Sequence, residues 1–263
     1  MYFIRLVGSF LKASIQNEMA YNANFWINIL HSILNLGTGI LGIFILFSQV
    51  DTIQGWTFAS TLAILGVYLI LGSLRRLFIG PSLESLAGMD GEVWSGKFDF
   101  TVLRPVDIQF QASFRYWQPL AFIDLSFGLG IMGLAIAQLG KALTLVGVFS
   151  FISSLFFGVL TLYSILLALA GLVFWSPGFL FTWIFDSLFQ MARYPVGIYP
   201  SWLRLVLTWI VPVGIMTTLP AEALSGTISF TRLAYGGILS ILLLVGASFV
   251  FRAGVKRYES ASS

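Results

Sequence analysis

Six long apolar runs dominate the chain, and each has the length of a helix that crosses a lipid bilayer. The runs cover residues 24–47, 57–79, 117–139, 143–175, 203–219 and 233–251. A helix needs about 20 apolar residues to cross the roughly 30 Å of hydrocarbon in a bilayer. The runs are continuous rather than alternating, which is typical of membrane helices and not of β-barrel strands. The pattern therefore predicts an all-α integral membrane protein with six transmembrane helices.

Two further segments are apolar without being simple spans. Residues 1–23 predict an amphipathic helix that lies in the membrane interface. Its apolar side chains recur every three or four residues: Phe3, Leu6, Val7, Phe10, Leu11 and Ile15. Residues 178–202 open with an aromatic stretch, 178–193, that is only about 24 Å long as a helix and contains Asp186. This stretch either crosses the membrane, which gives seven spans, or is a membrane-associated or re-entrant segment, which gives six.

The basic residues decide between six and seven spans. With six spans and both termini cytoplasmic, twelve of the 14 Lys and Arg residues lie inside, and only Lys141 and Arg232 lie outside. A seventh crossing would move Arg252, Lys256 and Arg257 to the outside. That arrangement would oppose the rule that cytoplasmic segments carry the excess of Lys and Arg. We therefore expect six spans with both termini on the cytoplasmic side.

Composition supports the membrane assignment and narrows the partners. Hydrophobic residues make up 58% of the 263 residues and charged residues only 10%. A water-soluble domain carries about a quarter of its residues as charged side chains, so most of this surface must face lipid. The net charge of +3 is small for a nucleic-acid-binding protein, and no nucleic-acid partner is expected. The chain has no cysteine, which excludes disulfides and thiol chemistry.

Most of the charge lies in one polar stretch between the second and third runs. Residues 75–115 hold five basic and five acidic side chains. We expect a short helix there, with Ser82 as its N-cap and Glu84 in its first turn, followed by glycine-rich turns. A single structured loop in an otherwise apolar protein is the natural place for a soluble partner to bind.

Part of this loop matches most of a nucleotide-binding motif. Residues 91–97 fit the first seven positions of G-x-x-x-x-G-K-[ST], but the eighth position is Phe98. The hydroxyl that would hold Mg²⁺ is therefore missing, and no strand pattern precedes the motif. We expect no ATP hydrolysis and no cofactor on this chain.

Two other motifs carry a family resemblance. The loop contains Gly96-Lys-Phe-Asp99-Phe-Thr-Val-Leu103-Arg104-Pro105, and a later segment reads Tyr194-Pro195-Val-Gly-Ile-Tyr199-Pro200, followed by Pro212 and Pro220-Ala221. With these motifs the chain resembles the type-2 ABC exporter permeases, in particular a bacterial subfamily of six-span permeases that pair with a separate ATPase subunit. The resemblance covers nearly all of residues 1–263, which would form a single transmembrane permease domain.

The resemblance implies a permease subunit of an ATP-binding cassette exporter in the bacterial plasma (inner) membrane. In such permeases the loop after the second span, here 80–116, forms a cytoplasmic coupling helix that docks on a separate ATPase, which holds the ATP and magnesium. A second permease chain, identical or related, completes the path. The residues implied in docking, or in bracing the docking surface, are Glu84, Asp90, Glu92, Lys97, Asp99 and Arg104. These charges could equally be ordinary solvated loop residues.

Polar side chains inside the spans are candidates for the substrate path. The first span places one stripe of them along a helix face: Asn24, Asn28, His31, Ser32 and Asn35. The stripe must face another helix or a water-filled path, so it serves either interhelical hydrogen bonding or substrate contact. His31 is the only histidine, and no metal site is expected.

Two acids, Asp124 and Asp186, also fall in membrane segments. An acid inside a membrane is a functional candidate, although pairing with Arg115, Arg193 or Arg204 would explain either one equally well. The cargo is expected to be a lipophilic or cationic drug-like compound, or a lipid or glycan. For a lipophilic cation, Asp124 is the first choice as the attracting group.

Other function classes compete with the exporter. A stand-alone secondary transporter or channel is one, but intramembrane acids are few and no paired broken helices suggest an inverted repeat. A membrane scaffold subunit has the same composition and stays open. A membrane-embedded enzyme would need a motif such as G-x-S-x-G or H-E-x-x-H, and the sequence has neither.

Overall fold

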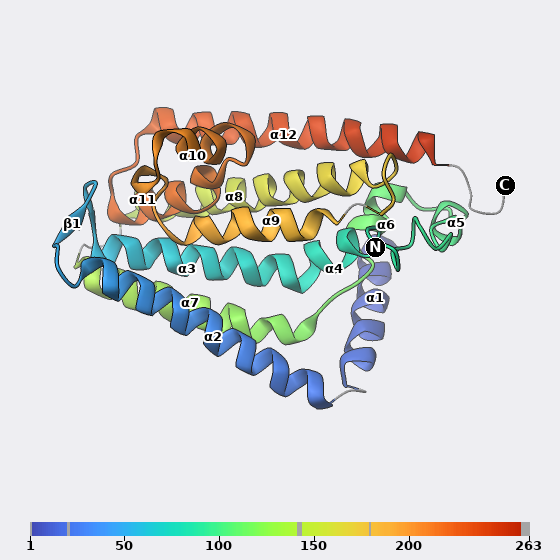
Figure 1. Cartoon of the computed structure of the whole chain (residues 1–263), viewed down its shortest axis with the longest axis horizontal. Helices are drawn as coiled ribbons and strands as arrows, with labels where there is room; N and C mark the ends of the chain where they lie inside the picture. The colour runs from blue at the N-terminus through green and yellow to red at the C-terminus, as the bar shows by residue number, and fades with distance from the viewer. Residues whose placement is uncertain (1, 20–21, 141–143, 179, 259–263) are drawn as a thin grey trace.

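A bundle of long, roughly parallel helices forms the computed structural model, which describes residues 2–19, 22–140, 144–178 and 180–258 (Figure 1). Within the described residues, five continuous helical segments are long and apolar enough to cross a membrane. They are built on α2 (Asn22–Phe47), α3 (Phe58–Leu74), α7 (Phe122–Leu139), α8 (Leu145–Leu172) and α12 (Phe230–Arg257). The prediction of an all-α membrane protein is confirmed.

Glycines let the spans pack closely in two pairs. α3 packs along α7, and α8 packs along α12. A methyl group added at Gly128 of α7 would come 2.9 Å from the backbone nitrogen of Ile70, and one at Gly171 of α8 would come 2.9 Å from the Cα of Phe251. Small residues at such interfaces let membrane helices approach each other closely, where van der Waals contact replaces the missing hydrophobic effect.

The spans differ greatly in how much of their surface the rest of the chain covers. In the span built on α3, 72% of the most apolar window is buried, against 17% in α2. The span around α3 is therefore the core of the bundle, and α2 turns most of its surface to lipid or to another chain.

The fifth apolar run is broken into two bent pieces, so the prediction of a continuous helix over 203–219 is wrong. The chain forms α10 (Ser201–Leu205) and a π-helical turn η5 (Val206–Ile210), then bends by 77° before η6 (Gly214–Thr218) and α11 (Leu219–Ser225). Pro212 lies in this bend. Proline has no N–H to donate and its ring clashes with the preceding turn, which explains the break.

Most of residues 178–193 form a short helix that buries one face, with Phe181, Phe185 and Phe189, and exposes the other, where Trp183 is 74% exposed. α9 (Phe181–Gln190) and the 3₁₀ turn η3 (Met191–Arg193) lie alongside α3 within the bundle (Figure 1). The rings of Tyr68 on α3 and Phe189 on α9 are 5.0 Å apart. The Thr217 hydroxyl donates a hydrogen bond of 2.9 Å to the carbonyl oxygen of Ala192. A further 3₁₀ turn, η4 (Val196–Ile198), follows, so α9 leads into the bent segment.

The two ends of the bundle have different structures. At one end, a small hairpin of β1 (Thr52–Ile53) and β2 (Trp56–Thr57) joins α2 to α3. Gln54 and Gly55 have φ angles of 53° and 82°, as a two-residue hairpin turn requires. At the other end lie α4 (Gly80–Glu84), α5 (Asp99–Val102), α6 (Ile108–Phe114) and the end of α12.

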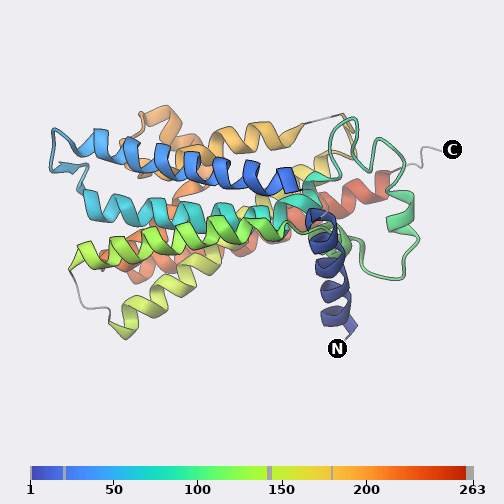
Figure 2. The ribbon, with the colours of Figure 1, turned by 90° about the horizontal axis from the view of Figure 1, so that it is seen from below.

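The N-terminal helix α1 (Tyr2–Met19) lies crosswise to the bundle in both Figure 1 and Figure 2. The Ser14 hydroxyl oxygen accepts a hydrogen bond from the backbone N–H of Trp117 (3.1 Å), and the Glu18 carboxylate accepts one from Leu120 (3.0 Å). α1 is therefore fastened to the segment that leads into α7, where a 3₁₀ turn η2 (Pro119–Ala121) begins that span. The helix is confirmed, and its place in the membrane interface stays a prediction.

Candidate functional site

The loop between the second and third spans starts as a continuation of the second span. α3 passes through a π-helical turn, η1 (Arg75–Ile79), into α4 without interruption, so this span runs from Phe58 to Glu84. Ser82 is therefore not the N-cap of a separate helix, as the sequence suggested. Its hydroxyl oxygen instead accepts from the backbone N–H of Tyr116 (2.8 Å) and donates to the Tyr116 carbonyl oxygen (3.0 Å). This exchange closes the base of the loop.

A buried carboxylate organises the inside of the loop. Glu92 is only 7% exposed and accepts hydrogen bonds from Arg115 (3.0 Å) and from the Tyr116 hydroxyl (2.7 Å). Burial, together with the hydrogen bond to Glu92, raises the pKa of Tyr116 to about 12. Residues 91–97, which resemble a nucleotide-binding motif, form turns around this carboxylate. Because a buried carboxylate is stable only when it is well paired, Glu92 is a structural brace.

An aromatic cluster ties the far side of the loop to the last span. Phe98 is fully buried, with its ring centroid 5.1 Å from that of Phe174 and 5.0 Å from that of Tyr258. The Tyr258 hydroxyl donates a hydrogen bond of 2.8 Å to Asp99, and burial, with Asp99 beside it, raises the pKa of Tyr258 to about 12. The loop is thus a packed unit attached to the end of α12.

The outer surface of this packed loop exposes several large apolar side chains. We call its exposed apolar residues the loop tip: Met89 (74% exposed), Trp94 (57%), Phe100 (67%) and Leu103 (79%). α5, which carries Phe100, lies at the end of the molecule, beyond the ends of the spans (Figure 1). Large exposed apolar side chains are typical of sites that contact another protein or a membrane.

The six residues that the resemblance assigned to docking or bracing divide into two groups. Glu92 is paired with Arg115, and Asp99 with Tyr258. Glu84 forms an ion pair of 2.6 Å with Arg75. The second group consists of Asp90, Lys97 and Arg104, whose side chains are exposed on the same loop as the loop tip. The first group holds the loop together, and the second is available to a partner.

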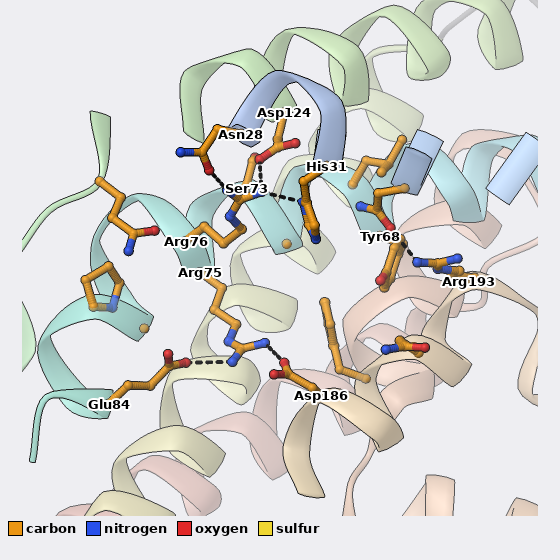
Figure 3. Close-up of a pocket in the computed structure, with 18 of the residues that line it drawn as sticks. Asn28, His31, Tyr68, Ser73, Arg75, Arg76, Glu84, Asp124, Asp186 and Arg193 are labelled. Carbon is orange, nitrogen blue, oxygen red and sulfur yellow. Dashed lines mark hydrogen bonds and ion pairs between the residues drawn. The ribbon is translucent and has the colours of Figure 1, made fainter. Parts of the chain in front are cut away.

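A cavity of about 520 Å³ lies in the half of the bundle next to this loop (Figure 3). Its walls come from α2, the span around α3, the first turn of α7, and α9 with η3. Four of the five residues proposed for the substrate path line it: Asn28, His31, Asn35 and Asp124. Ser32 does not, because it is 2% exposed and its hydroxyl donates to the carbonyl oxygen of Asn28. The side chain of Asn24 lies outside the described residues.

Both intramembrane acids are paired, and the partners expected from the sequence are wrong. Asp124 forms an ion pair of 2.6 Å with Arg76, whose guanidinium also contacts Asn28 and His31 (Figure 3). Asp186 pairs with Arg75. Arg75 and Arg76 lie where the predicted second run and the polar stretch overlap, and the structure places both in the π-helical turn, where they line the cavity. Asp124 therefore does not present an unpaired carboxylate to a cation.

A third arginine in the cavity was not predicted as a site residue. Arg193 closes η3, and its guanidinium donates to Asn35 and Thr38 of α2 and lies 5.0 Å from the ring centroid of Tyr68 (Figure 3). Sequence reasoning considered Arg193 only as a partner for the two acids. Its position at the end of the apolar stretch 178–193 is the sequence feature that could have marked Arg193 as a site residue.

Comparison with known families assigns the chain. The profile of the family described as ABC-2 family transporter protein matches residues 33–262. The chain belongs to this family. Accordingly, this ABC-2 chain is a multi-pass membrane permease component of an ABC transporter, a class that works with an ABC ATPase. A search among curated proteins finds no match.

Proposed function

We propose that this ABC-2 permease is the membrane subunit of a bacterial inner-membrane exporter and that its separate ATPase docks on the loop tip. The exposed apolar side chains of Phe100 and Leu103 carry the proposal, because the described residues leave them 67% and 79% exposed and α5 lies beyond the ends of the spans (Figure 1). In this arrangement the loop and both ends of the chain lie in the cytoplasm, and the ATPase holds the ATP and magnesium.

The loop is built to transmit force from such a partner to the bundle. α4 is continuous with the central span, so a push on the loop acts along that helix. Arg75 bonds both Glu84 at the end of this span and Asp186 on α9. The Tyr258–Asp99 hydrogen bond attaches the loop to α12. Closure of an ATPase on the loop tip would therefore move several walls of the cavity together, which is the mechanical step that ATP-driven transport needs.

The exposed face of α2 supports a second permease chain in the assembly. In α2 only 17% of the most apolar window is buried, and Trp26, Phe44 and Ile45 are each more than 60% exposed. The cavity lies against this helix. A second permease, identical or related, would pair across this side of the bundle and enclose the cargo path, with lipid covering the remaining surface.

The docking site is tested by truncating the loop tip. The double substitution Phe100→Ala and Leu103→Ala should greatly reduce the amount of ATPase that co-purifies in mild detergent, with normal membrane insertion. Truncating one hot-spot residue costs about 2 kcal/mol, or about thirtyfold in affinity. The matched control is Phe230→Ala with Leu145→Ala, because these residues are 85% and 91% exposed and lie at the opposite end of the bundle.

Three results bear on the proposal. Loss of the ATPase from the loop-tip variant alone supports it. Equal amounts of ATPase with both variants would place the docking site elsewhere. Gradient-driven uptake by the purified permease without any ATPase would instead support a secondary carrier.

A further inference from the structure

Arg193 lies close to the middle of the membrane-spanning bundle. Its guanidinium bonds Asn35 and Thr38, near the midpoint of the 26-residue helix α2. At 1.5 Å per residue, Asn35 is about 20 Å from the start of that helix. The ring that covers the guanidinium belongs to Tyr68, inside the central span. A cation at this depth is costly, and intramembrane ionisable residues mark functional sites by default.

Arg193 differs from the other arginines of the cavity in having no carboxylate partner. Arg75 is held by two acids and Arg76 by one. Among the residues that the structure describes, no acid lies within ion-pair distance of Arg193. Its hydrogen-bond acceptors are the neutral amide oxygen of Asn35 and the hydroxyl of Thr38. Its Nε is buried and has no hydrogen-bond partner among the described residues.

We propose that the cavity binds an oxyanion, a carboxylate or phosphate group, through the guanidinium of Arg193. Guanidinium presents its N–H donors in a planar fork that matches the two oxygens of such a group. Asn35, Thr38 and Tyr68 fix the position of this fork without neutralising its charge. Because the helices around the site are mostly apolar, its charge is screened less than a charge in bulk water, and an anion that reaches it is attracted more strongly.

The other charges of the cavity determine how such a molecule is oriented. Glu84 and Asp186 share Arg75, so this corner carries an excess of one negative charge and repels an anion. Arg76 and Asp124 neutralise each other. The attraction for an anion is therefore confined to Arg193, and the oxyanion binds at that deep position rather than at the arginines closer to the loop.

The size of the cavity leaves room for more than the oxyanion. About 520 Å³ is within the range of sites that hold a whole small molecule. Ile27, which is 64% exposed on α2, is among the lining residues, so the cavity adjoins the outer surface of that helix. The anionic group can thus belong to a lipid headgroup that enters from the bilayer or to a soluble organic anion.

This inference deepens the proposed function, because treating the anion as cargo rests on the exporter assignment, whereas its binding does not. The test uses the full-length chain in dodecyl maltoside, without ATP or ATPase. The probes are dodecyl phosphate, inorganic phosphate and dodecyltrimethylammonium, and the affinity is measured by ligand-induced thermal stabilisation. A failure to bind anions would leave the docking test of the loop tip untouched.

The wild-type protein should bind dodecyl phosphate at least about tenfold more tightly than dodecyltrimethylammonium. Arg193→Gln should weaken dodecyl phosphate binding at least about tenfold, and Arg193→Lys, which keeps the charge but not the fork, should weaken it less. The control Arg204→Gln should leave the affinity unchanged, because Arg204 lies outside the cavity and bonds only backbone carbonyl oxygens.

Two results would overturn the proposal. One is equal affinity of the wild-type protein for the anionic and the cationic dodecyl probes, which is decisive even when a variant does not fold. The other is equal affinity of the Arg193→Gln and Arg204→Gln proteins for dodecyl phosphate. Binding of inorganic phosphate as tight as that of dodecyl phosphate would support a soluble anion, and weaker binding would support a lipid. Both of these last results support the oxyanion site.

Discussion

The loop and the cavity next to it each contain groups that do not match their surroundings, and the mismatches run in opposite directions. At the loop tip, Phe100 and Leu103 expose apolar side chains where water is expected. In the cavity, Arg193 holds a charge within the apolar bundle. Each region also contains buried or partly buried ion pairs, such as Glu92–Arg115 in the loop and Asp124–Arg76 in the cavity.

This comparison separates framework from binding surface. Paired charges fix the shape of each region, because breaking them leaves an uncompensated charge. The exposed loop tip and the charge of Arg193, which no described acid pairs, are instead available for binding. An apolar protein surface would cover the loop tip, and an oxyanion would pair with Arg193. Variants of the paired framework residues should therefore lower stability. Variants of the loop tip or of Arg193 should lower binding with little effect on stability.

The largest expected effect comes from the loop framework. Glu92→Ala leaves Arg115 and the Tyr116 hydroxyl without their acceptor, and breaking a buried pair costs about 3–5 kcal/mol. The loop should unfold locally and lose the ATPase as well, while the spans stay inserted. Hydrogen exchange of the backbone amides of residues 85–101 measures the loss. The control Asp90→Ala, at an exposed position, should change protection by less than about 0.5 kcal/mol.

The corresponding test in the cavity has a slightly smaller expected effect. Arg76→Gln strands the buried Asp124 carboxylate, at a cost near the lower end of the same range, about 3 kcal/mol, because the Arg76 side chain is 27% exposed. Adding Asp124→Asn should restore most of the lost thermal stability. If the double variant were no more stable than Arg76→Gln alone, Asp124 would not depend on this pair.

The smallest expected effect concerns the attachment of α1. Burial raises the pKa of Glu18, although the hydrogen bond from Leu120 and the nearby Arg76 charge partly offset this. A carboxyl with a raised pKa favours the folded state most when it is protonated, so the attachment of α1 weakens as the pH rises above 4.5 through the raised pKa.

Glu18→Gln keeps an oxygen that accepts from Leu120 but removes the charge. Hydrogen exchange of α1 should therefore be slower in this variant than in the wild type at neutral pH. The two proteins should exchange alike at pH values well below 4.5, when each is compared at the same pH. A difference that persisted there would show that the charge of Glu18 is not its cause.

Much of the architecture follows from hydrophobic pattern alone, and the exceptions have local causes. Five apolar runs form continuous spans, and the amphipathic pattern near the N-terminus yields α1 (Tyr2–Met19). α8 ends at Leu172 rather than Trp175, and the Pro212 break was hidden because apolar residues surround the proline. The second span continues through α4 to Glu84, five residues beyond its apolar run, and the π-helical turn after Leu74 has no signature that hydropathy detects.

The candidate sites were less predictable, because their character depends on contacts between distant residues. Glu92 and Asp90 look alike in sequence, yet one is buried and paired and the other is exposed. Arg193 was visible as a charge near the membrane, but its neutral neighbours follow from the fold, which places η3 against Asn35 of α2 and Tyr68 of α3. The hydrophobic pattern predicted where the loop and the polar stripe lie. Only the fold shows which of their residues are paired and which are available for binding.

Site-specific crosslinking tests the docking of the ATPase on the loop tip most directly. The chain has no cysteine, so Leu103→Cys and the control Phe230→Cys each introduce a single reactive thiol. In cells that contain the ATPase, we predict that a short bifunctional crosslinker joins the permease to the ATPase through position 103 and not through position 230. Labelling of position 103 by a membrane-impermeant reagent added outside intact cells, without a crosslink to the ATPase, would contradict the account.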